Sequence, residues 1–289
     1  MNPLGVHALV FVGGWSEPES ERAIAAAAGH GYQIIEIPLL DPDGVDVPRT
    51  ARQLERAGLQ PVTSLGLSFA DDISSDDPAT VARGEAKLSL ALSVARDLGG
   101  KMLTGVLYSA LGKYGKTPSE AGRWSCVKVL SRLAERAAKA GIMLGLEPVN
   151  RYESNLVNTA DQALEVIGQI GSANVVVHLD SYHMNIEEAD PAAAIERCGA
   201  RLGYFHVNES HRGYLGTGTI DFSALFAALA RIDYRGAITF EAFSAGIGDP
   251  ALNAELAIWR ELWADSDDLA RHARRFMGAE WNAARQPIV

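Results

Sequence analysis

Short runs of Val, Ile and Leu recur along the chain, and within each run the apolar residues are mostly continuous rather than alternating with polar ones. Eight such runs cover residues 6–12, 32–38, 61–67, 102–108, 142–148, 174–180, 201–207 and 236–242. A continuous apolar run is typical of a strand that is covered on both faces, as in a parallel sheet. The pattern therefore predicts eight buried parallel strands.

Segments with helical spacing lie between these runs. Ala and Leu recur at intervals of three and four residues in segments 16–31, 81–99, 119–141 and 221–236, and most of these segments end in glycine. A terminal glycine is typical of a helix C-terminus. Asp221 stands where a helix N-cap is expected.

Strands and helices alternate at about 36 residues per unit, and no Pro-, Gly- or Ser-rich linker divides them. We therefore expect an α/β fold with a single (β/α)8 TIM barrel over residues 1–289, rather than a doubly wound sheet. Six units plus a small second domain fit the periodicity less well but remain open.

A long amphipathic stretch, about residues 249–285, follows the last predicted strand. Trp259 and Trp263 are spaced to lie one turn apart on one face of a helix. We expect this helical segment to pack against the barrel wall, with a subunit interface as the alternative.

Composition narrows the possible functions. The chain has 289 residues, 47% of them hydrophobic, and a formal net charge of −10, so it can bury a sizeable core. Its surface would repel nucleic acid and anionic lipid. Two cysteines are too few for a disulfide framework or a cysteine-based zinc site. The first twenty residues resemble neither a signal peptide nor a membrane span, so we expect a cytoplasmic protein.

Four of the predicted strands end in a residue that can bind a metal ion. These residues are Glu147 (IMLGLE), Asp180 (VVVHLD), His206 (GYFH) and Glu241 (AITFE). A barrel collects the carboxyl ends of its strands at one mouth, where active sites lie. Unpaired charges are costly to bury there, and a shared divalent cation would compensate them. We therefore expect a metal site formed by the last four strands.

The expected ligand set is rich in oxygen, has one nitrogen and lacks thiolate. This favours Mn²⁺ or Mg²⁺, with Co²⁺ tolerated. Taken singly, a Glu at a strand end is more often the partner of a Lys, an Arg or a backbone amide, and a lone His is more often a core residue. Four such residues on consecutive strands favour the metal interpretation.

Three further polar residues lie in loops just beyond strand ends: Glu153, His183 and Arg212. A carboxylate, an imidazole and a guanidinium there suit a substrate with hydroxyl or carbonyl oxygens. Helix capping or loop-closing salt bridges would explain the same residues without a substrate.

Four stretches, LEPVNRYESN, HLDSYHMNIEEAD, FHVNESHRGYLGTGTIDF and FEAFS, together resemble the ketose 3-epimerases. This family of xylose-isomerase-like barrels includes the D-tagatose, D-allulose (D-psicose) and L-ribulose 3-epimerases. The resemblance covers nearly the whole chain. It implies metal-dependent C3 epimerisation of free ketoses through a cis-enediolate. D-allulose/D-fructose is the favoured substrate pair, D-tagatose and L-ribulose are alternatives, and a homodimer or homotetramer is implied.

The resemblance also implies a role for each site residue. The metal ligands would be Glu147, Asp180, His206 and Glu241. Of these, Glu147 and Glu241 would double as the catalytic acid/base pair. Substrate contacts would come from Glu153, His183 and Arg212. The contacts to the far end of the sugar are variable in the family, and the candidates here are Phe11, Trp15, Ser64 and Tyr108.

Three other interpretations compete with this one. An aldose-ketose isomerase of the same barrel group would move a proton between C1 and C2 on one face. A sugar-binding protein would bind without turnover, but would have no reason to keep both Glu147 and Glu241 beside a metal. A zinc endonuclease relative would need extra histidines at the ends of strands three and four, which read SLGL and GVLY.

Overall fold

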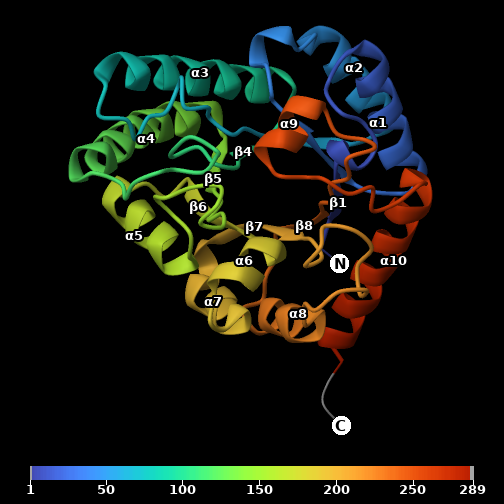
Figure 1. Ribbon diagram of the computed structural model, residues 1–289. Helices are drawn as coiled ribbons and strands as arrows, with labels where there is room; N and C mark the ends of the chain where they lie inside the picture. Colours follow the sequence, from blue (N-terminus) through green and yellow to red (C-terminus); the bar gives the residue numbers. More distant parts are fainter. Residues whose placement is uncertain (1, 287–289) are drawn as a thin grey trace.

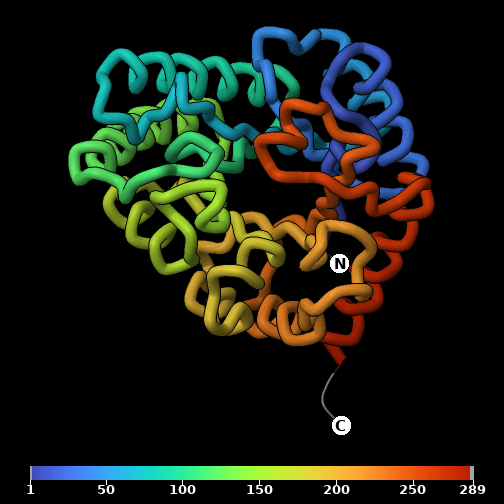
Figure 2. The backbone as a smooth tube through the Cα atoms, viewed as in Figure 1, coloured from blue at the N-terminus to red at the C-terminus, as the bar shows by residue number. Residues whose placement is uncertain are grey.

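The computed structural model describes residues 2–286 and contains a closed barrel of eight parallel strands in sequence order. Strand β1 pairs with β2 and also with β8, which closes the sheet. The chain runs once around the barrel from its blue to its red end (Figure 2). The predicted single (β/α)8 barrel is therefore confirmed. The strands are β1 Leu4–His7, β2 Ile34–Pro38, β3 Gln60–Ser64, β4 Met102–Thr104, β5 Met143–Leu146, β6 Val175–Asp180, β7 Leu202–Val207 and β8 Ala237–Phe240.

The helices form a ring around the strands (Figure 1). Within residues 2–286, none of them combines the length and apolarity needed to cross a membrane. The α-helices are α1 Glu17–Gly29, α2 Val47–Ala57, α3 Pro78–Asp97, α4 Glu120–Ala140, α5 Ala160–Ile170, α6 Ser181–Glu187, α7 Pro191–Cys198, α8 Phe222–Arg231, α9 Pro250–Glu255 and α10 Ser266–Ala284. Short 3-10 turns cover Ala8–Val10, Pro42–Gly44 and Gly199–Arg201.

Local sequence signals explain where these helices begin and end. A capping box of Ser16 and Glu19 starts α1. Asp221 caps α8 by accepting a hydrogen bond from the backbone N–H of Ala224, as predicted. Helix α4 ends at Gly141, whose φ of 68° is readily adopted only by glycine.

All eight strands are shorter than the apolar runs that predicted them, and β1 and β4 differ most clearly. The run 6–12 leaves the sheet after His7 and continues as the 3-10 turn Ala8–Val10. The run 102–108 leaves it after Thr104. The residues beyond each strand are still buried, because the chain turns inward at the barrel mouth. The apolar runs therefore predicted correctly which residues are buried, but they did not predict where the strands end.

The C-terminal stretch differs from the single long helix that the sequence predicts. It forms two helices, α9 and α10, and residues 256–265 between them are not helical. Trp259 and Trp263 consequently do not share a helix face: Trp259 is 71% exposed, whereas Trp263 is 8% exposed. Helix α10 packs on α8, β8 and β1, which is the position expected of a helix on the barrel wall.

Candidate active site

The four predicted metal-binding residues meet at the carboxyl end of the barrel. Asp180 ends β6, His206 is the penultimate residue of β7, and the two are register partners. Glu147 and Glu241 directly follow β5 and β8. All four side chains are buried. Parallel strands in one barrel end at one mouth, so residues far apart in sequence come together there.

His206 is at the centre of this group. Its Nδ1 lies 3.9 Å from Glu147 Oε1, 4.0 Å from Asp180 Oδ2 and 3.6 Å from Glu241 Oε1. These separations are too long for hydrogen bonds, and Nδ1 is buried without a hydrogen-bond partner. Two ligand atoms that are each about 2.1 Å from one ion lie roughly 3 to 4 Å apart. The residues present therefore fit a divalent cation.

The other nitrogen of His206 is held by a residue that the sequence analysis missed. Nε2 lies 2.6 Å from Glu36 Oε2, and Glu36 also accepts a hydrogen bond from the Tyr204 hydroxyl at 2.8 Å. A proton on Nε2 that is donated to Glu36 leaves the Nδ1 lone pair facing the three carboxylates. A carboxylate behind a metal-binding histidine commonly fixes its ring and tautomer in this way.

Three overlapping groups of residues within the described chain have the spacing of a metal site: Glu147/His178/His206, Glu147/Asp180/His183 and Asp180/His206/Glu241. His178 does not fit as a ligand through Nδ1. The Thr104 hydroxyl lies 3.2 Å from the Gly145 carbonyl, to which it can only donate, so it accepts from His178 Nδ1 at 2.8 Å. This distribution of protons favours the predicted set of three carboxylates and His206.

Burial and mutual repulsion alter the protonation of the carboxylates. Burial raises the pKa of Glu147 well above its ordinary value and that of Glu241 to about 8. Burial alone would lower the pKa of His206, but the facing charges of Glu36, Glu241 and Glu147 hold this pKa well above its ordinary value. The metal-free site therefore retains protons near neutral pH.

Glu153, His183 and Arg212 are also brought to this mouth. Arg212 Nη2 lies 3.4 Å from Glu153 Oε1, and Asn150 donates its side-chain amide to the same oxygen at 2.8 Å. The backbone N–H of Asn150 donates to His183 Nδ1 at 3.1 Å. Burial and the nearby Arg212 charge lower the pKa of His183 well below its ordinary value. The neutral ring therefore has its proton on Nε2, where it can donate to a substrate oxygen.

The backbone conformation of Arg212 is unusual, with a φ of 63°. Its backbone N–H donates to the Glu209 carbonyl at 2.8 Å. The guanidinium lies 3.9 Å from the ring centre of Tyr182 and 4.6 Å from that of Phe243. Such stacking on two rings holds a cation in place without neutralising it.

These residues border a cavity of about 590 Å³ that is partly open to solvent. Glu147, Glu153, His183, Arg212 and Glu241 line one part of it. The remaining wall is mostly apolar and includes Leu9, Pro38, Leu65, Val106, Leu252 and Leu256. Such a mixed wall suits a small polyol with a polar reacting end.

The predicted rim residues are only partly confirmed as neighbours of this cavity. Ser64 lines it, with Oγ 3.4 Å from His7 Nε2. Phe11 is buried in the core and stacks on His30, and Trp15 packs on the same core. The Tyr108 hydroxyl lies against the backbone carbonyls of Glu147 and Val157.

Phe11 and Tyr108 do not line this cavity, and direct contact of either side chain with substrate stays a prediction. Tyr108 supports the backbone of Glu147.

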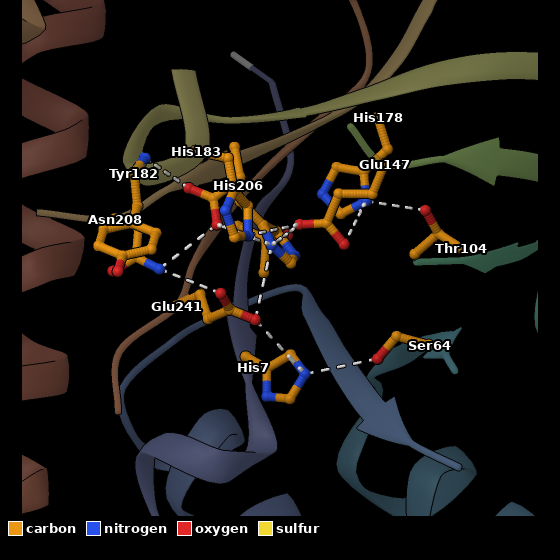
Figure 3. Close-up of polar contacts among 12 residues, drawn as sticks. His7, Ser64, Thr104, Glu147, His178, Tyr182, His183, His206, Asn208 and Glu241 are labelled. Atoms are coloured by element: carbon orange, nitrogen blue, oxygen red, sulfur yellow. Dashed lines mark hydrogen bonds and ion pairs between the residues drawn. The ribbon is translucent and has the colours of Figure 1, made fainter. Parts of the chain in front are cut away.

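The sequence analysis missed several polar residues around the site: Glu36, His7, His178, Asn150 and Asn208. Glu36 had a detectable signal, since it is a single carboxylate within the apolar run YQIIEIP. It lies in the middle of β2, whereas the predicted ligands lie at strand ends. Figure 3 shows His7, His178 and Asn208 around Glu147, His206 and Glu241, with the two glutamates on different sides of His206.

Comparisons with known proteins agree with this geometry. The family described as Xylose isomerase-like TIM barrel matches residues 24–277. An L-ribulose 3-epimerase of Methylomonas sp. (strain DH-1) is 51% identical, over 94% of this chain and 96% of that protein. A ketose 3-epimerase of Arthrobacter globiformis is 43% identical, over 95% of each chain.

A solved structure is similar to this chain in both sequence and fold. The crystal structure of D-allulose 3-epimerase from Methylomonas sp. in complex with D-allulose superposes with a TM-score of 0.95 and 50% identity, covering 96% of this chain and 97% of that one. Family match, identity and fold all agree over nearly the whole length. The chain belongs to the ketose 3-epimerase family of xylose isomerase-like TIM barrels.

Proposed function

We propose that the protein epimerises free ketoses at C3, with Glu147 and Glu241 as the two acid/base groups. One observation carries the proposal: two buried carboxylates from β5 and β8 approach one histidine from different sides. Inversion at C3 needs one group to remove a proton from one face of the sugar and another to deliver a proton to the opposite face.

In the proposed reaction, the carboxylate of one glutamate takes the C3 proton. The electrons of the C3–H bond form the C2=C3 double bond, and the carbonyl π electrons move to O2, giving a planar cis-enediolate. The second glutamate, which starts protonated, returns a proton to C3 from the other face, and the C2 carbonyl re-forms. The roles of Glu147 and Glu241 exchange in the reverse direction.

The residues that would hold a divalent cation are Glu147, Asp180, His206 and Glu241. Bound there, the cation would supply Lewis-acid polarisation of the ketose carbonyl. The oxygen-rich ligand set favours Mn²⁺ or Mg²⁺, with Co²⁺ tolerated. Arg212 and the Nε2–H of His183 would donate to O2 and its neighbours, and Glu153 would accept from a hydroxyl. The mostly apolar wall would contact the far end of the sugar.

The relatives support a ketose substrate, but their names mention different sugars. Those named above are an L-ribulose 3-epimerase, a ketose 3-epimerase and a D-allulose 3-epimerase bound to D-allulose. We propose that D-allulose/D-fructose and L-ribulose/L-xylulose are both substrates, since all four sugars carry the same 1-hydroxy-2-keto-3-hydroxy unit at C1 to C3, where the reaction takes place. A homodimer or homotetramer remains part of the proposal.

A panel of free ketoses tests the reaction class. Incubation of D-fructose, D-allulose, D-tagatose and L-ribulose with the protein and Mn²⁺ should give the C3 epimer in each productive case, and no aldose. In D₂O the product should carry deuterium at C3, which NMR can detect. An aldose product would indicate an isomerase instead. Binding without conversion or deuterium exchange would indicate a sugar-binding protein.

The pH dependence of stability tests the protonation of the site. The pKa of Glu241 is about 8 in the folded protein, against an ordinary value of 4.5. Between these values the folded state binds more protons than the unfolded state, so the free energy of unfolding of metal-free protein should fall as pH rises through this window. Mg²⁺ replaces these protons, so it should raise Tm more at pH 8 than at pH 6.

Thermal denaturation with and without Mg²⁺ measures both effects. The Glu241→Gln variant is the control, because it cannot titrate at this position and should show a smaller change in metal-free Tm between pH 6 and pH 8. An equal pH dependence in the variant and the wild type would contradict the assignment to Glu241.

A further inference from the structure

Asn208 is a buried amide that neither its position in the sequence nor the proposed reaction accounts for. It directly follows β7, and its side chain is fully enclosed. Its Nδ2 donates to Glu241 Oε2 at 3.0 Å and lies 3.4 Å from Asp180 Oδ2 (Figure 3). An amide nitrogen has two hydrogens, so it can donate one to each carboxylate.

The backbone of Asn208 is fixed independently of these contacts. Its N–H donates to Ser181 Oγ at 2.8 Å, and its carbonyl accepts from the same hydroxyl at 2.7 Å. Ser181 is the first residue of α6, immediately after Asp180. The amide is therefore anchored to the segment that carries one of the carboxylates it contacts, and this fixes its direction relative to Asp180.

The contact gives the two oxygens of Glu241 different surroundings. Oε2 accepts from Asn208 and lies 3.7 Å from Arg212 Nη1. Oε1 faces His206 Nδ1 at 3.6 Å and His7 Nε2 at 3.8 Å. The carboxylate of Glu147 accepts no comparable amide hydrogen bond from the described residues. The two glutamates are thus held in unequal ways.

We infer that Asn208 is a positioning residue, whose amide holds Asp180 and Glu241 in one relative geometry and keeps Glu241 Oε1 directed into the site. The inference rests on the proposed function, in which Glu241 both exchanges a proton with C3 and helps to hold the cation. Residues that orient the ligands of a metal site in this way commonly affect affinity and rate together.

The test is the pair of variants Asn208→Leu and Asn208→Ala. Leucine keeps a similar volume but cannot donate, and alanine serves if leucine prevents folding. In both variants, kcat for the best ketose and the affinity for Mn²⁺, measured by calorimetry, are each expected to fall roughly 10- to 100-fold. KM should change less than about threefold, because Asn208 makes no hydrogen bond to Glu153, His183 or Arg212 within the described chain.

The split between kcat and KM separates positioning from a merely structural role. Reduced packing alone would lower Tm without lowering kcat and Mn²⁺ affinity together at a nearly unchanged KM.

Asn2→Leu is the matched control. Asn2 is also a buried asparagine, and its Nδ2 donates to the carbonyls of Tyr234 and Gly236 at 2.9 and 2.8 Å, at the opposite end of the barrel. This variant should lose Tm but retain kcat, KM and Mn²⁺ affinity. The same losses in Asn2→Leu would overturn the inference.

Values of kcat and Mn²⁺ affinity within about twofold of wild type in both Asn208 variants would also overturn it. If the wild type converts no ketose, the proposed function fails, and Mn²⁺ affinity alone then decides the inference: equal affinity in the variants and wild type rejects it.

Discussion

Glu147→Gln and Glu241→Gln should each lower kcat for ketose epimerisation by roughly 10²- to 10⁴-fold, the range for loss of a general acid or base. The amide can neither accept the C3 proton nor return one, so each variant lacks one of the two required groups. Conversion of ketose at saturating Mn²⁺, followed by NMR, measures the loss. Near wild-type turnover in either variant would reject the two-base scheme.

We expect the loss of kcat in these two variants to occur without unfolding of the protein. Burial raises the pKa of both glutamates, and that of Glu241 to about 8, so Glu241 holds a proton in the metal-free protein at pH 7. Glutamine resembles the protonated form in shape and charge. Metal-free Tm of both variants at pH 7 should therefore equal or exceed that of the wild type.

Glu153→Gln is the matched control for this pair. Glu153 is also buried and lies at the same mouth, but its partners are Asn150 and Arg212. We expect its replacement to raise KM more than it lowers kcat, because the proposed role is to bind a hydroxyl. A loss of kcat as large as in Glu147→Gln would assign Glu153 to the proton transfers as well.

Removal of divalent ions with EDTA should lower turnover at least 10²-fold, and Mn²⁺, Mg²⁺ or Co²⁺ should restore it. The orphaned Nδ1 of His206 and the three carboxylates around it provide the physical reason. Elemental analysis must accompany the assay. Full activity in protein shown to be free of metal would contradict the proposed site.

The Asp180→Asn variant distinguishes a residue that only binds the ion from one that also transfers a proton. Asp180 is a proposed ligand without an acid/base role, and asparagine keeps an oxygen that can cap the backbone N–H of Tyr182. This variant should need a higher Mn²⁺ concentration but recover most of kcat at saturation. The Glu147→Gln and Glu241→Gln variants should not recover, whatever the Mn²⁺ concentration.

Much of the site could be predicted because strand ends are local features. An apolar run followed by a polar residue marks the point where a buried strand reaches the barrel mouth. This rule found Glu147, Asp180, His206 and Glu241, and the structure brings all four together. The number of these residues and their order along the chain were sufficient to place them on neighbouring strands, since the barrel strands follow sequence order.

The rim was predicted less well, because apolarity does not reveal which buried residues face a cavity. Phe11 and Tyr108 follow strands β1 and β4, as a rim residue would, yet their side chains enter the core. Residues 256–265 have helical spacing but are not helical. For Phe11 and Tyr108, packing in the core outweighs the local pattern.

The sequence by itself determined the alternation of strands and helices, the barrel and the four strand-end groups, because each depends on neighbours within one βα unit. Only the tertiary structure decided which other residues contact and orient these four strand-end groups. Glu36 reaches His206 across 170 residues, and Asn208 reaches Glu241 across 33. The first contact exists only once β1 and β8 have paired and closed the barrel, and the second only once β7 and β8 have paired. No local pattern encodes either contact.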